Sequence, residues 1–248
     1  TKMLKSEYLE EEIPVYDITV EGTHNFFANN ILVHNCQEIT LPTKPIQHID
    51  DPNGEIALCI LSAINIGKIK TNDELEVLCD LSIRSLDELI DYQNYPVKAA
   101  EICTKARRSL GVGYIGLAHY LAKNGENYGD PGAWKLVHDL SEAFQYYLIK
   151  ATVNLAKEKG ACEYSHRTKY GQGILPIDTY KRDVDEIVPN NLKYDWDSLR
   201  EQVKQYGVRN STLSAQMPSE SSSVVSNATN GIEPPRGYLS VKKSKKGP

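Results

Sequence analysis

An unbroken apolar run, residues 56–66 (IALCILSAINI), constrains the fold more than any other feature of this chain. Asn53-Gly54 precedes the run and Gly67 follows it. A strand with one face in solvent alternates apolar and polar residues, whereas a strand covered on both faces is continuously apolar. The run therefore predicts a strand that is buried on both faces, as in a parallel sheet flanked by helices.

Helical periodicity surrounds this strand. Apolar residues recur at helical spacing in residues 72–92, 97–108, 117–123, 132–159 and 196–206. Short β-like stretches lie at residues 110–114 (LGVGY) and 213–217 (LSAQM). Strands that alternate with helices indicate an α/β architecture with a mainly parallel sheet. These strands are too few to close a barrel by themselves.

Composition excludes several classes of protein. The chain is 40% hydrophobic and 25% charged, with a net charge of −5, so no basic excess points to nucleic acid or anionic lipid. We expect no secretory signal, and no apolar run approaches the roughly 18 residues of a transmembrane helix. Its five cysteines form no CxxC pair, which argues against a disulfide framework and a zinc site. We expect a cytoplasmic protein without a membrane partner.

Residues 15–36 (VYDITVEGTHNFFANNILVHNC) form a separate pattern near the start of the chain. Two β-rich runs flank Asn29 and Asn30, which tolerate turn conformations. The pattern predicts a hairpin that carries His34 and Asn35 back towards Asp17.

This string has the residue types that peptide splicing needs. The Asn35 carboxamide can attack its own main-chain carbonyl, close a succinimide and cut the bond to Cys36, an intramolecular step that gains from enforced proximity. His34 can polarise that carbonyl or protonate the leaving nitrogen. The Cys36 thiol can accept the upstream flank as a thioester, which an S-to-N shift converts to a peptide bond. Asp17 and His24 would assist from a neighbouring strand.

The string resembles the C-terminal motif blocks of inteins of the hedgehog/intein fold, a short all-β segment. The resemblance divides the chain into an intein segment, residues 1–35, and a second part, residues 36–248. A whole intein also needs an N-terminal half with its own nucleophile, and only 35 residues precede Cys36. We therefore expect either that an N-terminal intein half acts as a partner in trans, or that this chain is a piece of a longer reading frame. The initial Thr1 favours the second alternative.

Two cysteines and a carboxylate form a second constellation. Cys36 and Glu38 are two residues apart, so they share one side of an extended segment. Cys59 lies inside the apolar run, where a cysteine is more often a small buried hydrophobe than a reactive group.

Residues 218–222, immediately after the last β-like stretch, concentrate hydroxyls at a strand-to-helix turn: Pro218, Ser219, Glu220, Ser221 and Ser222. Such a turn, with free main-chain N–H groups, can hold a phosphate. A plain helix cap is the alternative, because serine is a favoured cap. The Glu220 carboxylate would repel a diphosphate, so its backbone N–H or a ribose contact is expected to matter more.

From Cys36 onward the chain resembles the C-terminal half of the catalytic barrel of the class I ribonucleotide reductase large subunit. The resemblance rests on CQEITLPTKPI, NGEIALCILSAINIG, RRSLGVGYIGLAHYLAKNG, GVRNSTLSAQMPSESSS and SNATNGIEPPRGYLSVK. It implies an α/β fold, part of a ten-stranded α/β barrel.

The resemblance also implies roles for the constellation. Cys36 resembles the thiyl-radical cysteine that abstracts the ribose 3′ hydrogen, and Glu38 the carboxylate that takes the 3′-hydroxyl proton. Cys59 resembles one of two thiols that reduce the 2′ carbon and end as a disulfide. Residues 218–222 resemble the loop that holds the substrate diphosphate. Cys36 would thus be the splicing nucleophile first and the radical carrier afterwards, so the reductase should be inactive while the intein remains attached.

Partners and cofactors follow from the same resemblance. They are a ribonucleoside diphosphate substrate, a metal-containing small (beta) subunit that supplies the radical, and thioredoxin or glutaredoxin as external dithiol reductant. The chain itself is expected to bind no cofactor and no metal, and the complete subunit to be a homodimer. Regions that the family pattern needs are missing on both sides, so this chain alone should not turn over substrate.

Two other interpretations stay open. The chain could be a non-catalytic remnant of an intein-interrupted reductase gene. Residues 111–116 (GVGYIG) also satisfy the GxGxxG fingerprint of dinucleotide-binding dehydrogenases. A helical, cationic stretch precedes them, and no acidic residue closes a following strand about 20 residues on, so close packing at a strand bend is preferred. Cys79, Cys103 and Cys162 match no catalytic position and are expected to be packing residues.

Overall fold

The computed structural model describes residues 25–28, 31–34, 39, 41–58, 60–189, 191–235 and 237. Its strands are β1 (Asn25–Ala28), β2 (Ile31–His34), β3 (Ile60–Asn65) and β4 (Leu110–Ile115). The α-helices are α1 (Asn72–Tyr92), α2 (Lys98–Arg107), α3 (Leu117–Lys123), α4 (Pro131–Lys159), α5 (Pro176–Thr179), α6 (Trp196–Tyr206) and α7 (Glu220–Val225). Short 3-10 turns occur at η1 (Ile66–Lys68), η2 (Ser165–Arg167), η3 (Tyr170–Gln172) and η4 (Arg182–Glu186).

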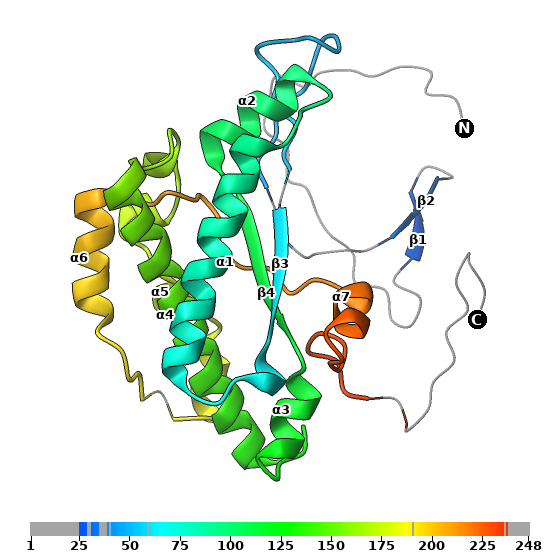
Figure 1. Cartoon of the computed structure of the whole chain (residues 1–248), viewed down its shortest axis with the longest axis vertical. Helices are drawn as coiled ribbons and strands as arrows, with labels where there is room; N and C mark the ends of the chain where they lie inside the picture. Colours follow the sequence, from blue (N-terminus) through cyan, green and yellow to red (C-terminus); the bar gives the residue numbers. More distant parts are fainter. Residues whose placement is uncertain are drawn as a thin grey trace.

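The centre of the fold is a small parallel sheet. β3 pairs with β4 in parallel, from Ile60 opposite Leu110 to Asn65 opposite Ile115, and the two strands run side by side in Figure 1. On the other side of β4, Val112 forms a parallel bridge with Ser214. The predicted parallel α/β arrangement is therefore confirmed, although the stretch at residues 213–217 is reduced to this bridge.

The two neighbouring strands differ in burial. Every residue of β4 is buried, because β4 lies between β3 and the segment around Ser214. β3 is shorter than the predicted run and mostly only half-buried, and Leu61 is 42% exposed. The prediction of a strand buried on both faces is thus wrong for β3 in this part of the chain. Among the described residues, β3 has a strand neighbour only on its β4 side.

The helices match their predicted ranges closely. α1, α3 and α6 have the predicted bounds, and α2 and α4 differ from the predicted limits by one residue. Their ends carry the expected signals: the Thr71 hydroxyl accepts from the Glu74 N–H at 3.2 Å, and α4 begins with Pro131 and ends before Gly160 at φ 85°. The short turns between residues 165 and 186 were not anticipated.

The core fills the space between β4 and two long helices. α1 lies along α4, and α6 lies against the other side of α4 (Figure 1). Ile83 and Ile90 of α1 meet Phe144 and Leu148 of α4 in one apolar cluster. The Tyr114 ring of β4 contacts the Phe144 ring edge-on, with centroids 5.2 Å apart, so the sheet and both helices share one core. Among the described residues, no helix is long and apolar enough to cross a membrane.

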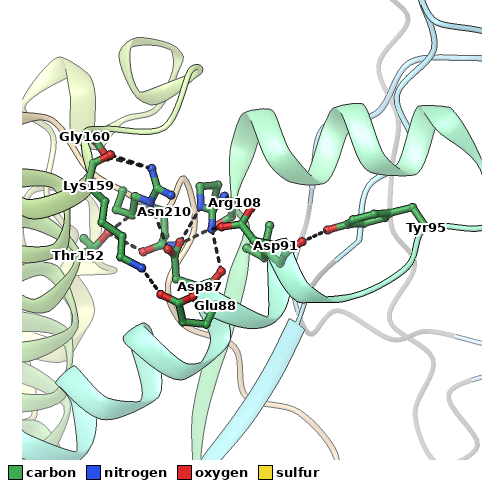
Figure 2. Close-up of polar contacts among 11 residues, drawn as sticks. Asp87, Glu88, Asp91, Tyr95, Arg108, Thr152, Lys159, Gly160 and Asn210 are labelled. Atoms are coloured by element: carbon green, nitrogen blue, oxygen red, sulfur yellow. Dashed lines mark hydrogen bonds and ion pairs between the residues drawn. The ribbon is translucent and has the colours of Figure 1, made fainter.

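A mostly buried polar cluster links the elements of this core (Figure 2). We call Asp87, Asp91, Arg108, Thr152 and Asn210 the Asp87 cluster. Arg108 donates its Nε to the Asp87 carboxylate at 2.7 Å and its Nη2 to the Asp91 carboxylate at 2.8 Å. Asn210 donates its side-chain amide to Asp87 at 2.9 Å and accepts from the Thr152 hydroxyl at 2.9 Å. The cluster therefore joins α1, α4, the residue that ends α2, and the segment after α6.

The predicted hairpin is present near the start of the chain. β1 pairs antiparallel with β2, with Ala28 opposite Ile31. Asn29 and Asn30, the expected turn residues, lie outside the described part of the chain. His34 is the last residue of β2. The expected approach to Asp17 lies outside the described residues.

Candidate functional site

The structure describes one of the predicted groups of site residues. Residues 218–222 are described, and for His34 the description covers the backbone. The remaining predicted residues lie outside the described part of the chain: Asp17, His24, Asn35, Cys36, Glu38 and Cys59. The candidate site is therefore built from the segment that follows Ser214.

Residues 217–231, which we call the Ser219 loop, fold around a buried serine. Ser219 is 2% exposed. Its N–H donates to the Asn230 side-chain oxygen at 3.1 Å, and its hydroxyl donates to the Met217 carbonyl at 3.0 Å. Its carbonyl accepts from the Ser223 N–H at 2.8 Å. The polar groups of Ser219 thus hold the shape of the loop.

The neighbouring residues face solvent. Pro218, Glu220, Ser221 and Ser222 are exposed, and the last three form the first turn of α7. First-turn N–H groups have no acceptor within their own helix, so Ser221 and Ser222 can each offer a hydroxyl and an N–H to an anion. Ser219 occupies the cap position of α7, but its side chain makes no capping hydrogen bond.

The Ser219 loop is fastened to the carboxyl ends of the two parallel strands. The side-chain amide of Asn65, the last residue of β3, donates to the Ser226 carbonyl at 3.3 Å. The Gly116 N–H, just after β4, donates to the Thr229 carbonyl at 2.9 Å. Carboxyl ends of parallel strands are where α/β sheets hold their ligands. The sequence interpretation missed Asn65 and Asn230, although a polar Asn65 at the end of an apolar run was a usable signal.

Several buried polar atoms around this loop have no hydrogen-bond partner among the described residues. They are the hydroxyls of Ser223 and Thr229 and the side-chain oxygen of Asn65. Buried polar groups are normally paired. Unpaired acceptors and donors at the carboxyl end of a sheet are groups that a polar ligand or water can satisfy.

The glycines of residues 111–116 serve packing. Gly111 and Gly113 lie inside β4, and a side chain at Gly113 would collide with the Ala215 carbonyl and approach the Met217 sulfur to 2.8 Å. Gly116, at φ 85°, ends the strand. In a dinucleotide fingerprint the glycines form the turn after the strand, so this geometry contradicts that interpretation. The close packing is confirmed, but the expected strand bend is replaced by a continuous strand.

The cysteines away from the predicted site pack in the interior, as expected. Cys79, Cys103 and Cys162 are buried. Burial raises the pKa of the Cys79 thiol to about 12 and that of the Cys162 thiol to about 11. Burial also raises the pKa of Cys103. Thiols with raised pKa values are poor nucleophiles at neutral pH. Within the described ranges, no three His, Cys, Asp or Glu residues are grouped to hold a metal ion.

The family model and the relatives that match this chain point to the same family. Residues 15–248 match the family model described as ribonucleotide reductase, barrel domain. The ribonucleoside-diphosphate reductase subunit alpha of Haemophilus influenzae is 63% identical over 212 residues, which is 86% of this chain and 28% of that protein. The Escherichia coli ribonucleoside-diphosphate reductase 1 subunit alpha is 59% identical over 212 residues, with the same coverage of both chains. The enterobacteria phage T4 subunit alpha is 49% identical over 214 residues, again with that coverage.

These relatives are much longer than this chain, which spans little more than a quarter of their length. The match nevertheless covers the parallel strands, the long helices and the Ser219 loop, because the family model extends over all of them. The small parallel sheet flanked by helices is consistent with one part of an α/β barrel wall. The chain belongs to the ribonucleotide reductase barrel-domain family.

Proposed function

We propose that residues 36–248 form the part of a ribonucleoside-diphosphate reductase large subunit that holds the reacting ribose and diphosphate, and that residues 1–35 are an intein segment. The main observation behind this proposal is the 63% identity, over 86% of this chain, to a protein named as subunit alpha of that reductase. Since this chain spans 28% of that relative, the complete activity requires the rest of the subunit.

In this proposal three side chains act on the ribose. Cys36, as a thiyl radical, takes the 3′ hydrogen, and Glu38 takes the proton of the 3′ hydroxyl. The 2′ hydroxyl takes a proton from one thiol of the pair that contains Cys59 and leaves as water. Cys59 and a second thiol then supply two electrons to the 2′ carbon and become a disulfide, which an external dithiol reduces. Cys36 finally returns its hydrogen to the 3′ carbon. A metal-containing small subunit would supply the radical.

The geometry of β3 supports the proposal that the substrate lies along this strand. Cys59 directly precedes Ile60, the first residue of β3, and Asn65 at the other end anchors the Ser219 loop through its 3.3 Å hydrogen bond to Ser226. One strand therefore connects a proposed reducing thiol to a proposed diphosphate site. The exposed first turn of α7, with Ser221 and Ser222, would bind the diphosphate through N–H and hydroxyl groups.

Two observations support the splicing segment. β2 ends at His34, so Asn35 and Cys36 follow directly in the sequence from a paired strand. The relatives align over 212 residues, which is close to the length from Cys36 to the last residue. The family model begins earlier, at residue 15, so the boundary at Cys36 needs a direct test.

Splicing is tested by mixing the chain with an upstream half that carries the N-terminal intein segment and following ligation by intact mass. The parent chain should lose residues 1–35 and gain the upstream flank. Asn35→Ala should block release of the intein, whereas Asn53→Ala, at an exposed turn, should ligate normally. Hydrolysis beside Cys36 without ligation, or no reaction, would refute the splicing proposal and favour the remnant interpretation.

Reductase activity is tested on the full-length ligated subunit, with a small subunit, a dithiol and a ribonucleoside diphosphate. Deoxynucleotide formation should be lost in Cys59→Ser and in Glu38→Gln. The matched control is Cys162→Ala, which removes a buried packing thiol and should keep most of the activity. Equal activity of the Cys59→Ser and Cys162→Ala proteins would contradict the assigned roles.

A further inference from the structure

A pocket separate from the Ser219 loop lies between the turns η2 and η3, α5 and residues 211–214. Its volume is about 640 Å³, and residues 217–231 do not contribute to its lining. Cavities of roughly 300–1,000 Å³ are typical of small-molecule sites, which combine apolar walls with a few placed polar groups. We call this cavity the Arg167 pocket.

The charged side chains of the Arg167 pocket are cationic. Arg107, Arg167 and Lys169 line it, and none of its described lining residues is acidic. Arg107 forms an ion pair with Glu55 at 2.8 Å. Arg167 and Lys169 are exposed, and neither has a carboxylate partner within the part of the chain that the structure describes. The pocket therefore carries uncompensated positive charge.

Two guanidinium groups of this pocket share one aromatic ring. Arg107 Cζ lies 4.7 Å from the centroid of the Tyr164 ring, and Arg167 Cζ lies 4.2 Å from it. Cation–π contacts to the same ring hold both groups in place. The two like charges are therefore neighbours, although only Arg107 has a carboxylate partner among the described residues. Such charges repel each other, and a bound anion would offset the repulsion.

An ordered turn positions the backbone of Arg167 and Lys169. The Thr168 hydroxyl, between them, donates to the Ser165 carbonyl at 2.6 Å and accepts from the Gly171 N–H at 2.9 Å. The Lys169 carbonyl accepts from a backbone N–H four atoms of turn further on, at residue 174, over 2.8 Å. Since the turn is ordered before a ligand arrives, binding costs less conformational entropy.

The rest of the lining offers a hydroxyl donor and apolar surface. The Ser214 hydroxyl accepts from the Gln145 side-chain amide at 2.9 Å, so its own hydrogen can donate to another group. Tyr170, Ile174 and Pro176 also line the pocket and are only half-buried. A bare anion would leave this apolar surface in contact with water, whereas an anion attached to a ring would cover it.

We propose that the Arg167 pocket binds a small phosphate monoester that carries an apolar ring, with the phosphate held by Arg167 and Lys169 and the ring against Tyr170 and Ile174. A guanidinium binds phosphate through paired N–H groups, and an ammonium adds a point charge. An amine would be repelled. The proposal is independent of both the reductase and the splicing activity.

The probes are phenyl phosphate, benzyl alcohol and inorganic phosphate, which separate the contribution of the charge from that of the ring. They are titrated into the 248-residue chain by isothermal titration calorimetry at low ionic strength. Phenyl phosphate should bind at least about tenfold more tightly than benzyl alcohol, the scale of one hydrogen bond to a charged group. It should also bind more tightly than inorganic phosphate, because its ring buries apolar surface. Added salt should weaken its binding.

Two pairs of variants locate the site. Arg167→Gln should weaken phenyl phosphate binding about tenfold. Its matched control is Arg182→Gln, because Arg182 Cζ also lies over a tyrosine ring, that of Tyr180, at 4.3 Å but does not line the pocket. Lys169→Gln should also weaken binding, whereas Lys70→Gln, at an exposed lysine outside the pocket, should bind normally.

The Ser219 loop is the alternative phosphate site of this chain, and a further variant distinguishes the two. Ser221→Ala combined with Ser222→Ala removes two hydroxyls of that loop and should leave phenyl phosphate binding unchanged. Loss of binding in this double variant, with normal binding in Arg167→Gln, would overturn the proposal. So would the absence of saturable phenyl phosphate binding, or equal binding of phenyl phosphate and either other probe. Since Arg167 and Lys169 are exposed, their variants should remain folded, which circular dichroism checks.

Discussion

The Asp87 cluster and the Ser219 loop lie at opposite ends of β4, and they differ in whether their buried polar groups have hydrogen-bond partners. Arg108 lies just before the strand and Gly116 just after it. In the cluster, both carboxylate oxygens of Asp87 accept hydrogen bonds, from Arg108, Asn210 and Arg209. Around the loop, the buried hydroxyls of Ser223 and Thr229 have no partner among the described residues.

This difference distinguishes polar groups that stabilise the fold from polar groups that are left for a ligand. A buried polar group that is fully paired stabilises one arrangement of the chain, whereas an unpaired group leaves a position for a ligand. Parallel α/β barrels show the same division, with stability at the amino ends of the strands and function at the carboxyl ends. The comparison therefore predicts that the Asp87 cluster stabilises the fold, and it supports the proposed binding role of the Ser219 loop.

The largest effect is expected for Asp87→Ala. This change leaves the Arg108 guanidinium, whose side chain is 5% exposed, without its buried partner. Loss of one member of a buried pair costs about 3–5 kcal/mol, so urea unfolding should show a decrease of that size. The control is Asp80→Ala, which removes a partly exposed pair with Arg84 and should cost about 1 kcal/mol or less. Similar losses in both variants would contradict the structural role of the cluster.

A matched pair of hydroxyl deletions compares the two regions directly. Thr152→Val removes a hydroxyl that donates to Asn210 Oδ1 at 2.9 Å and accepts from the Asn210 N–H at 3.0 Å. It should lower the free energy of unfolding by about 1–3 kcal/mol, because the side-chain oxygen and the backbone N–H of Asn210 lose this partner. Ser223→Ala removes a buried hydroxyl without a partner in the described part of the chain and should change stability by less than about 0.5 kcal/mol. Thermal and urea unfolding of both variants measure the difference, and a larger loss in Ser223→Ala would reverse the comparison.

The smallest effect concerns pH. Hydrogen bonds from Arg108 lower the pKa of Asp91 below its ordinary value of 3.8. The unfolded chain therefore binds this proton more readily than the folded chain does, so the stabilisation is complete above the ordinary pKa and is lost as the pH falls through the lowered value. Since the Asp91 side chain is 50% exposed, the contribution should be below about 1 kcal/mol.

The test is the difference in urea midpoint between the parent chain and Asp91→Asn as the pH is lowered. The two proteins should differ at neutral pH and converge below pH 4, the region set by the lowered pKa. A constant difference at every pH would show that the Asp91 charge does not contribute.

Local elements could be predicted well from this sequence. The helices α1, α3 and α6 have their predicted bounds, because their apolar periodicity and end signals agree. The hairpin of β1 and β2 was predicted from two β-rich runs around Asn29 and Asn30. The Ser219 loop was located from its hydroxyls, but not its internal hydrogen bonds, which depend on Asn230 eleven residues away.

The amino-acid sequence by itself determined the helices, the parallel strands and the residue types of the proposed site, because periodicity, capping and turn chemistry act over a few neighbouring residues. Only the tertiary structure decided the burial of β3 and the pairing of Asp87 with Arg108 and Asn210. These features join residues that are between 21 and 123 positions apart. Such contacts depend on which segments the core brings together, and that is a property of the packed chain as a whole.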